Sequence, residues 1–205
     1  MSKIPAPTGP ATSLAALTRC NFGTFRGYVR TLLGEVEFLL GRLDAHLRPA
    51  RPEQVQRLVF VCLGNINRSA FANAVAERLG LRTCSIGLAT TTGAPAFHLA
   101  QQTAREFGYS LEAHSATDLT DHHRQDGDYY LVMEVRHLHR LIKAGIPKHR
   151  IGFLGHWSRP HRIHLHDPHT LSEEYFQTCF AQLHAAVHCL SSHLRLAGSP
   201  AALAQ

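Results

Sequence analysis

The stretch Cys62-Leu63-Gly64-Asn65-Ile66-Asn67-Arg68-Ser69 joins a predicted strand to a predicted helix. Before it, residues 57–61 are rich in β-branched and aromatic side chains, which is typical of a buried parallel strand. After it, residues 70–79 are rich in alanine and predict a helix with Ser69 as its N-cap and Gly80 as its C-terminal stop. A thiol therefore ends the strand, and an arginine lies where the helix begins.

This loop has the features of an anion site. Backbone N–H groups of a tight loop can converge on an anion, and the N-terminus of the following helix adds partial positive charge. Gly64 allows a tight turn, and Asn65 tolerates a left-handed backbone. The guanidinium of Arg68 matches two oxygens of a phosphate-like dianion. Because the same positive field stabilises a thiolate, we predict that Cys62 is a nucleophile rather than a buried structural thiol.

With this motif between strand and helix, the chain resembles the low-molecular-weight protein tyrosine phosphatases. Their signature is a strand ending in Val-Cys, then x-Gly-Asn-Ile-Cys-Arg-Ser and a helix, and it matches Val61 to Ser69 except at Asn67. The resemblance covers about residues 56–195. It implies an α/β fold with a doubly wound four-stranded parallel sheet flanked by helices. The phosphate-binding residues it implies are Leu63, Gly64, Asn65, Ile66, Asn67, Arg68 and Ser69.

The rest of the pattern agrees with such a fold. We expect further strands at 82–88, 130–133 and 151–154, and helices at 93–107, 135–144 and 172–194. Alternating strands and helices favour a parallel sheet with right-handed crossovers. Ligands of such sheets bind beyond the carboxyl ends of the strands, where the Cys62 loop is predicted to lie.

The candidate general acid is Asp167, which precedes Pro168. A departing alkoxide or phenoxide needs a proton, and a well-placed acid accelerates its departure about 10²–10⁴-fold. Pro168 favours an extended Asp167 whose side chain projects, although an Asp-Pro pair also forms ordinary turns. The resemblance favours the acid, because the family's general acid belongs to an Asp-Pro at this place.

The resemblance thus implies a phosphomonoester hydrolase, most similar to a protein-tyrosine-phosphatase. We expect Cys62 to form a cysteinyl-phosphate while Arg68 holds the equatorial oxygens. Asp167 would protonate the leaving oxygen and then activate water. Ser69 would stabilise the thiolate, and Asn65 would hold the loop in shape. No metal or other cofactor is expected.

Two departures from the family concern the substrate, which we expect to be a phosphotyrosine protein or a small phosphomonoester. The aromatic pair that follows the family's Asp-Pro is His169-Thr170 here, and residues 88–92 lack an aromatic side chain. Preference for an aryl phosphate therefore stays open, with Phe71 and Trp157 as candidate replacements. Ile66, where arginine phosphatases carry threonine, argues against phosphoarginine.

A third departure concerns oxidation. Asn67 stands where the family often has a second loop cysteine, which protects the nucleophile by forming a disulfide. We therefore expect Cys62 to over-oxidise more readily, unless Cys84 serves as its resolving thiol.

Five histidines crowd the sequence around Asp167: His156, His161, His164, His166 and His169. They lack the cysteine or carboxylate partners at tight spacing that a metal site needs. We expect them to line the cleft and to make substrate binding depend on pH near neutrality.

The N-terminal third differs from the rest of the chain. We assign residues 1–23 to a disordered leader, 24–55 to an amphipathic helical extension and linker, 56–195 to the catalytic domain and 196–205 to a flexible tail. One apolar stripe has helical spacing and consists of Phe25, Tyr28, Val29, Leu32, Leu33, Val36, Leu39, Leu40, Leu43 and Leu47. We expect it to pack on the catalytic domain or on a second copy in a homodimer. A partner protein bound through residues 24–47 is an alternative, and membrane attachment is disfavoured by the acidic residues.

Composition argues against a nucleic-acid-binding, membrane-spanning or secreted protein. The chain has 205 residues and a formal net charge of +6, and residues 1–58 hold eight of its 21 Lys and Arg but only four of its 15 Asp and Glu. The positive charge is concentrated in the N-terminal region, and this distribution does not indicate a nucleic-acid-binding protein. No apolar run approaches the ~20 residues of a membrane span, and we see no secretory signal. Five widely spaced cysteines suggest reduced thiols and a cytoplasmic protein.

Two other functions remain as alternatives. An arsenate reductase on the same fold needs further redox cysteines, but Cys179 and Cys189 lie within one predicted helix. A phosphate-loop pseudoenzyme, acting as a binding module through its N-terminal helix, would not need the intact set of Cys62, Arg68 and Asp167.

Overall fold

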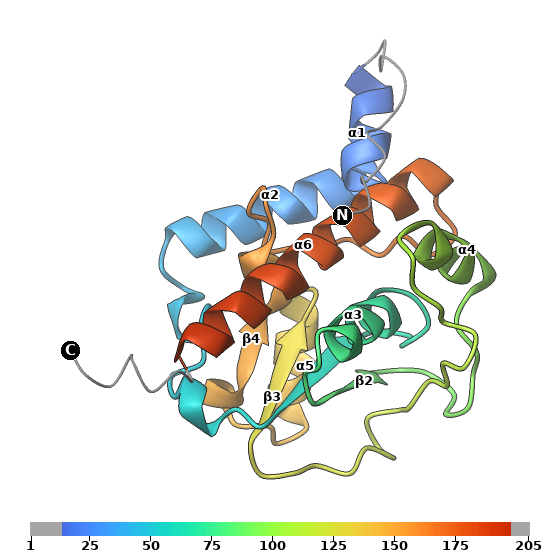
Figure 1. Ribbon diagram of the computed structural model, residues 1–205. Coiled ribbons are helices and arrows are strands. Elements are labelled where there is room, and N and C mark those ends of the chain that lie inside the picture. The colour runs from blue at the N-terminus through green and yellow to red at the C-terminus, as the bar shows by residue number, and fades with distance from the viewer. Residues whose placement is uncertain (1–13, 198–205) are drawn as a thin grey trace.

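The computed structural model describes residues 14–197, which form a parallel sheet with helices on both faces (Figure 1). The strand order is β2-β1-β3-β4. The strands are β1 (Arg57–Cys62), β2 (Thr83–Gly87), β3 (Asp128–Val132) and β4 (Ile151–Phe153). The predicted doubly wound four-stranded sheet is confirmed.

Two hydrophobic cores explain the apolar run of β1. Leu58 and Phe60 enter the core beneath α3, α4 and α6, whereas Val59 and Val61 enter the core beneath α5. A strand buried on both faces needs no alternation of polar and apolar residues. The covering helices are α3 (Arg68–Arg78), α4 (His98–Glu106), α5 (Val135–Lys143) and α6 (Glu173–Ala197), and short 3-10 helices occur at Asp44–His46, Pro52–Gln54, Lys148–Arg150 and Leu154–Trp157.

Two predicted helix starts are wrong. Helix α3 begins at Arg68 with Asn67 as its N-cap, so Ser69 lies inside the first turn. The helix expected from residue 93 begins only at His98, because Pro95 forms an isolated antiparallel bridge with Ser115.

The N-terminal region holds two helices, α1 (Leu14–Phe22) and α2 (Phe25–Leu39). Assigning residues 14–22 to a disordered leader is therefore wrong, while residues 1–13 lie outside the described part. The second helix is shorter than the predicted 24–47, and Gly41 follows it with a left-handed φ of 71°. At the other end α6 continues through residues 196 and 197, so the predicted tail does not begin at residue 196, and residues 198–205 lie outside the described part.

Helix α2 packs on the catalytic domain with the face opposite to its apolar stripe. Its buried residues are Gly27, Thr31 and Gly34. Most of the stripe is exposed, and Phe25 and Leu39 are 74% and 79% exposed. The prediction that the stripe packs on the catalytic domain is therefore wrong for the residues of α2. Leu43 and Leu47, which follow the helix, do contact the core beneath α5.

None of the helices within residues 14–197 is long and apolar enough to span a bilayer.

Candidate active site

Cys62 lies at the carboxyl end of β1, where the sheet's connections diverge toward β2 on one side and β3 on the other. Its side chain is 2% exposed. The Sγ atom accepts a hydrogen bond from the Asn65 N–H at 3.2 Å and lies 3.0 Å from Ser69 Oγ. A backbone amide and a hydroxyl thus both lie within hydrogen-bonding distance of the sulfur.

Asn65 holds the loop around this sulfur. Its φ is 52°, in the left-handed region that asparagine tolerates. Its Nδ2 group donates to Ser69 Oγ and to Ser85 Oγ of β2, each at 2.9 Å, and its Oδ1 accepts from the Thr117 N–H at 2.9 Å. The carbonyl oxygen of Asn65 lies 2.6 Å from Nε2 of His114. One side chain therefore ties the loop to two neighbouring segments.

The backbone of the loop leaves donors available to an anion. The N–H groups of Gly64, Ile66 and Asn67 donate to no other group in the described part of the chain. They lie between the sulfur and the start of α3, whose first N–H groups carry the positive end of the helix dipole. Such a set matches the equatorial oxygens of a bound phosphoryl group.

Arg68 is fully buried beside the loop. Its Nη1 donates to Glu134 Oε1 at 2.6 Å and to the Leu165 carbonyl at 2.8 Å, and its Nη2 lies 2.6 Å from Asp167 Oδ2. Its Nε has no hydrogen-bond partner among the described residues, which leaves a donor for a ligand. Burial lowers the pKa of Arg68, but the charges of Asp167, Glu134 and Cys62 raise it by more, so the guanidinium stays charged.

Asp167 therefore lies at the same site as the loop. Its side chain is 26% exposed, and its Oδ1 accepts the His169 N–H at 3.2 Å. Burial raises the pKa of Asp167, but the charge of Arg68 and the hydrogen bond from His169 outweigh it and hold this pKa below its ordinary value. Asp167 is therefore a carboxylate when no substrate is bound.

Glu134 is a site residue that the sequence reasoning missed. It lies two positions beyond the end of β3, as the N-cap of α5, so it reaches the same sheet edge as Cys62. Its carboxylate pairs with Arg68, with Arg136 at 2.7 Å and with Arg30 of α2 at 3.9 Å. Burial raises the pKa of Glu134, but the charge of Arg68 and the hydrogen bond from Arg136 contribute to holding it far below the ordinary value. An acidic residue just beyond a buried strand was the signal that could have found it.

The aromatic contacts near the loop come from an unexpected residue. Phe71 stacks on Phe180 in the core and Trp157 packs against His193, so neither replaces the family's missing aromatic pair. Instead, the N–H of Phe97 donates to the Ile66 carbonyl at 3.0 Å, which places Phe97 beside the loop.

The ring of Phe97 contacts the ring of His169, with 4.7 Å between their centroids. His169 in turn lies next to Asn67, with 3.5 Å between His169 Nδ1 and Asn67 Nδ2. The sequence does not predict Phe97 as a site residue, because it places residue 97 inside a helix rather than in the loop before one.

The other histidines do not line this site. His161, His164 and His166 contact α2 or pack beneath it, and His156 lies 3.2 Å from His161. The expectation that all five histidines line the cleft is therefore wrong. Within residues 14–197, no three His, Cys, Asp or Glu side chains are grouped as a metal site requires.

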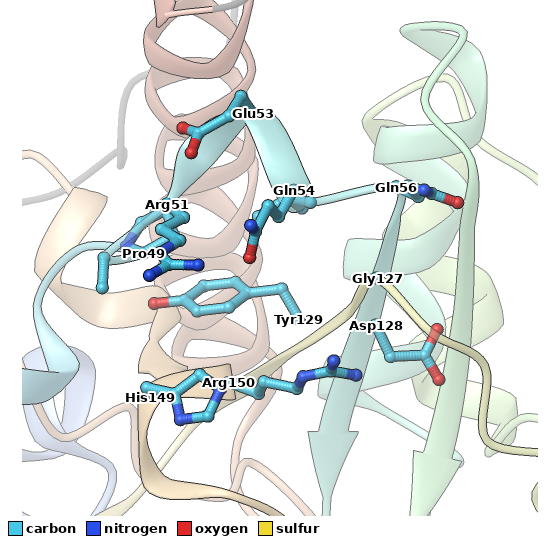
Figure 2. Close-up of a pocket in the computed structure, with 12 residues that line it drawn as sticks. Pro49, Arg51, Glu53, Gln54, Gln56, Gly127, Asp128, Tyr129, His149 and Arg150 are labelled. Carbon is cyan, nitrogen blue, oxygen red and sulfur yellow. The ribbon is translucent and has the colours of Figure 1, made fainter.

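A separate pocket of about 580 Å³ opens at the other end of the sheet (Figure 2). Its wall includes Arg51, Asp128, Tyr129, His149 and Arg150. Asp128 begins β3 and Arg150 precedes β4, so this pocket lies at the amino ends of the strands, away from Cys62. It contains no nucleophilic thiol and does not belong to the active site.

A family model described as low molecular weight phosphotyrosine protein phosphatase matches residues 57–198. The chain belongs to this family. The resemblance inferred from the motif is confirmed, and the chain is a phosphatase of this fold. Helices α1 and α2 precede the matched region.

Named relatives of this phosphatase family cover about two thirds of the chain. The low molecular weight protein-tyrosine-phosphatase Wzb of Escherichia coli is 32% identical over 129 residues, which cover 62% of this chain and 86% of that protein. The probable low molecular weight protein-tyrosine-phosphatase AmsI of Erwinia amylovora is 30% identical over 138 residues, covering 64% and 92%. The crystal structure of the Erwinia amylovora tyrosine phosphatase AmsI gives a TM-score of 0.60 at 26% identity and covers 68% of this chain and 93% of that one.

Proposed function

We propose that the chain hydrolyses phosphotyrosine on proteins through a cysteinyl-phosphate at Cys62. The observation that carries this proposal is the position of Arg68. It is fully buried, it has a free Nε donor among the described residues, and it lies 2.6 Å from Asp167. A nucleophile, an anion clamp and an acid thus belong to one cluster.

The two chemical steps use these groups in turn. The Cys62 thiolate attacks phosphorus, the bond to the leaving oxygen breaks, and protonated Asp167 gives its proton to that oxygen. Arg68 and the N–H groups of Gly64, Ile66 and Asn67 stabilise the equatorial oxygens. In the second step the Asp167 carboxylate takes a proton from water, which attacks phosphorus and releases the thiolate. The Ser69 hydroxyl, 3.0 Å from the sulfur, stabilises the departing thiolate.

A phosphotyrosine substrate is supported by the names of the relatives and by the surroundings of the loop. Leu63 and Ile66 are partly exposed, and the rings of Phe97 and His169 form an edge-to-face pair beside the loop. These apolar and aromatic surfaces would hold the phenyl ring of the substrate. Phe97 therefore takes the place of the missing aromatic pair.

The test is steady-state hydrolysis of a phosphotyrosine peptide and of p-nitrophenyl phosphate, with Cys62→Ser as the control. We expect turnover of both substrates and none by the control. Turnover of p-nitrophenyl phosphate alone would place the natural substrate outside phosphotyrosine. Absence of turnover with both would contradict the proposal and favour a binding module.

The arsenate reductase alternative finds little support in the cysteines. Cys179 is fully buried in α6, and burial raises its pKa to about 12. Such a thiol is a poor nucleophile for a redox relay. All five cysteines are free, and we propose a cytoplasmic location, where thiols stay reduced.

We propose further that the exposed stripe of α2 pairs with α2 of a second copy. Arg26 and Glu37 lie on one flank of the stripe, eleven positions apart and symmetric about the midpoint between Thr31 and Leu32. In an antiparallel two-fold pair, Arg26 would face the partner's Glu37 twice while the apolar residues meet between them. Charge complementarity thus favours a homodimer over other occupants of this face.

Light scattering tests the homodimer. We expect a dimer mass for the wild type, a monomer for Leu33→Glu and for Arg26→Glu, and a dimer again when Arg26→Glu is combined with Glu37→Arg. A monomeric wild type at all concentrations would contradict the homodimer. Binding of that monomer to anionic lipid vesicles, lost in Leu33→Glu, would assign the stripe to a membrane surface instead.

A further inference from the structure

Helix α2 contacts the segment that carries the general acid. Its buried face is made of small residues, so the helix approaches this segment closely. A Cβ atom at Gly27 would lie 2.7 Å from His166 Cδ2, and one at Gly34 would lie 3.5 Å from the Cβ of His164. His164 and His166, which precede Asp167 in the chain, therefore pack against a helix that lies before the region matched by the family.

Glu35 makes the strongest of these contacts. One oxygen of its carboxylate accepts the Ile163 N–H at 2.8 Å, and the other lies 3.1 Å from His161 Nδ1. A charged acceptor on a backbone N–H fixes the path of the chain more firmly than a neutral one. Glu35 is the one acidic residue of α2 whose side chain contacts this segment, because the side chain of Glu37 makes no hydrogen bond or ion pair within the described residues.

Further polar contacts extend along the same segment. Thr24 Oγ1 lies 3.2 Å from His166 Nε2, next to the acid itself. Arg162 Nη1 donates to the Asn21 carbonyl at 2.6 Å. The segment is thus held at residues 161, 162, 163 and 166 by the N-terminal helices.

The other side of the segment is fixed by the catalytic domain. The Leu165 N–H donates to the Met133 carbonyl at 2.9 Å, and the Leu165 carbonyl accepts from Arg68. Between these anchors and Glu35, the backbone that leads into Asp167 has little freedom. Because Asp167 must reach the leaving oxygen from this backbone, the conformation of residues 163–166 sets how well it donates a proton.

We propose that Glu35 is a positioning residue for the general acid, so that α2 is part of the catalytic apparatus. This inference rests on the proposed function. Loss of Glu35 would loosen the Ile163 backbone and let Asp167 sample orientations that do not reach the leaving oxygen. Attack by Cys62 and binding at Arg68 would change little, because Glu35 contacts neither residue.

Leaving-group dependence separates this role from a general structural one. Nitrophenolate is stable without a proton and departs with little help, whereas phenolate is basic and needs the acid. For the full-length Glu35→Ala variant we expect kcat/KM to fall about 10-fold with phenyl phosphate and no more than about 2-fold with p-nitrophenyl phosphate. Glu35→Gln keeps an acceptor for Ile163 and should retain more activity with phenyl phosphate. Glu53→Ala, at an exposed position outside α2 and the active site, is the control and should match the wild type.

The outcomes distinguish the inference from the proposed function. A wild type that hydrolyses neither ester would overturn the proposed function and the inference with it. If the wild type is active, equal losses with both esters in Glu35→Ala would overturn the positioning role, and so would unchanged rates. Should Glu35→Ala fail to fold, the comparison is made with Glu35→Gln and Thr24→Val, for which a selective loss with phenyl phosphate is again the expected result and an equal loss the contrary one.

Discussion

Arg68 Nη2 and Asp167 Oδ2 lie 2.6 Å apart, so the proposed phosphate clamp and the proposed acid form an ion pair when no substrate is bound. This pair keeps Asp167 ionised, a state that cannot donate a proton. A phosphate dianion bound at Arg68 would compete with the carboxylate for the same guanidinium. Substrate binding would thereby raise the pKa of Asp167 and favour the protonated form that the first step requires.

Asp167→Asn tests the acid. We expect kcat with phenyl phosphate to fall about 10²–10³-fold, because amide nitrogen cannot supply the proton, and kcat with p-nitrophenyl phosphate to fall much less. Steady-state rates with the two esters measure the difference. Asp126→Asn, at a fully exposed position near the amino end of the sheet, is the control. Equal losses with both esters would assign Asp167 to phosphate binding instead.

Asn65 offers a test of loop geometry with two variants. Asn65→Gly keeps the left-handed φ of 52° but loses the side-chain hydrogen bonds to Ser69, Ser85 and Thr117. Asn65→Ala loses the same bonds and adds backbone strain of about 1–2 kcal/mol. We expect both variants to lose activity and the alanine variant to unfold at lower urea concentration. Equal stability of the two variants would show that the loop relaxes to another conformation.

Glu134→Ala tests the buried charge cluster. Removal of this carboxylate leaves Arg68 and Arg136 without their shared partner, and breaking such a buried pair costs about 3–5 kcal/mol of the free energy of unfolding. Urea titrations of Glu134→Ala, Glu53→Ala and the wild type give the comparison, with Glu53→Ala, at an exposed position outside the cluster, expected within about 0.5 kcal/mol of the wild type. A loss below about 1 kcal/mol in Glu134→Ala would mean that Asp167 alone neutralises Arg68.

Buried histidines near Glu134 predict a loss of stability in acid. Burial lowers the pKa of His137 from 6.5 to about 3 and that of His164 from 6.5 to about 4. Between pH 6.5 and the lowered pKa of each histidine, the unfolded chain therefore binds more protons than the folded protein. The folded state has its full stability above pH 6.5 and loses it progressively as the pH falls toward 4.

Melting temperatures recorded between neutral pH and pH 4 test whether the stability of the folded state falls with pH as predicted. Each unit of pKa difference corresponds to about 1.4 kcal/mol at 25 °C. A shift of 1 kcal/mol changes the melting temperature by about 2–4 °C in a chain of this size. We expect His164→Gln to reduce the slope of melting temperature against pH. An unchanged slope in this variant would assign the acid sensitivity to other groups.

Asn67 predicts how the enzyme responds to peroxide. With no second cysteine in the loop, oxidation of Cys62 should proceed past the sulfenic acid, and thiol should not restore full activity. Asn67→Cys should restore reversibility by forming a disulfide with Cys62. Full recovery of the wild type after peroxide would contradict this prediction. Cys84 cannot serve as the resolving thiol, because it pairs with Val59 in the sheet and packs against the core on the face opposite to Cys62.

Local sequence was sufficient for the fold class and for the candidate site. The apolar run before Cys62 predicts a strand buried on both faces, because its residues lack alternation, and the alanine-rich run after Arg68 predicts a helix. Asn65 and Gly80 were expected at positions that need a left-handed backbone or a helix stop, and both have positive φ. These features depend on residues close in sequence, which is why one sequence reveals them.

Contacts between distant segments were decided only by the tertiary structure. Glu134 lies 66 positions from Arg68, and Glu35 lies 128 positions from Ile163, so no local pattern could pair them. The apolar stripe of α2 was expected to pack inward, since burial of apolar area usually dominates packing. Small residues at Gly27 and Gly34 instead allow a close approach of the opposite face, and hydrogen bonds to the acid segment fix it there. Sequence periodicity located the stripe, but only the three-dimensional contacts showed which face the catalytic domain binds.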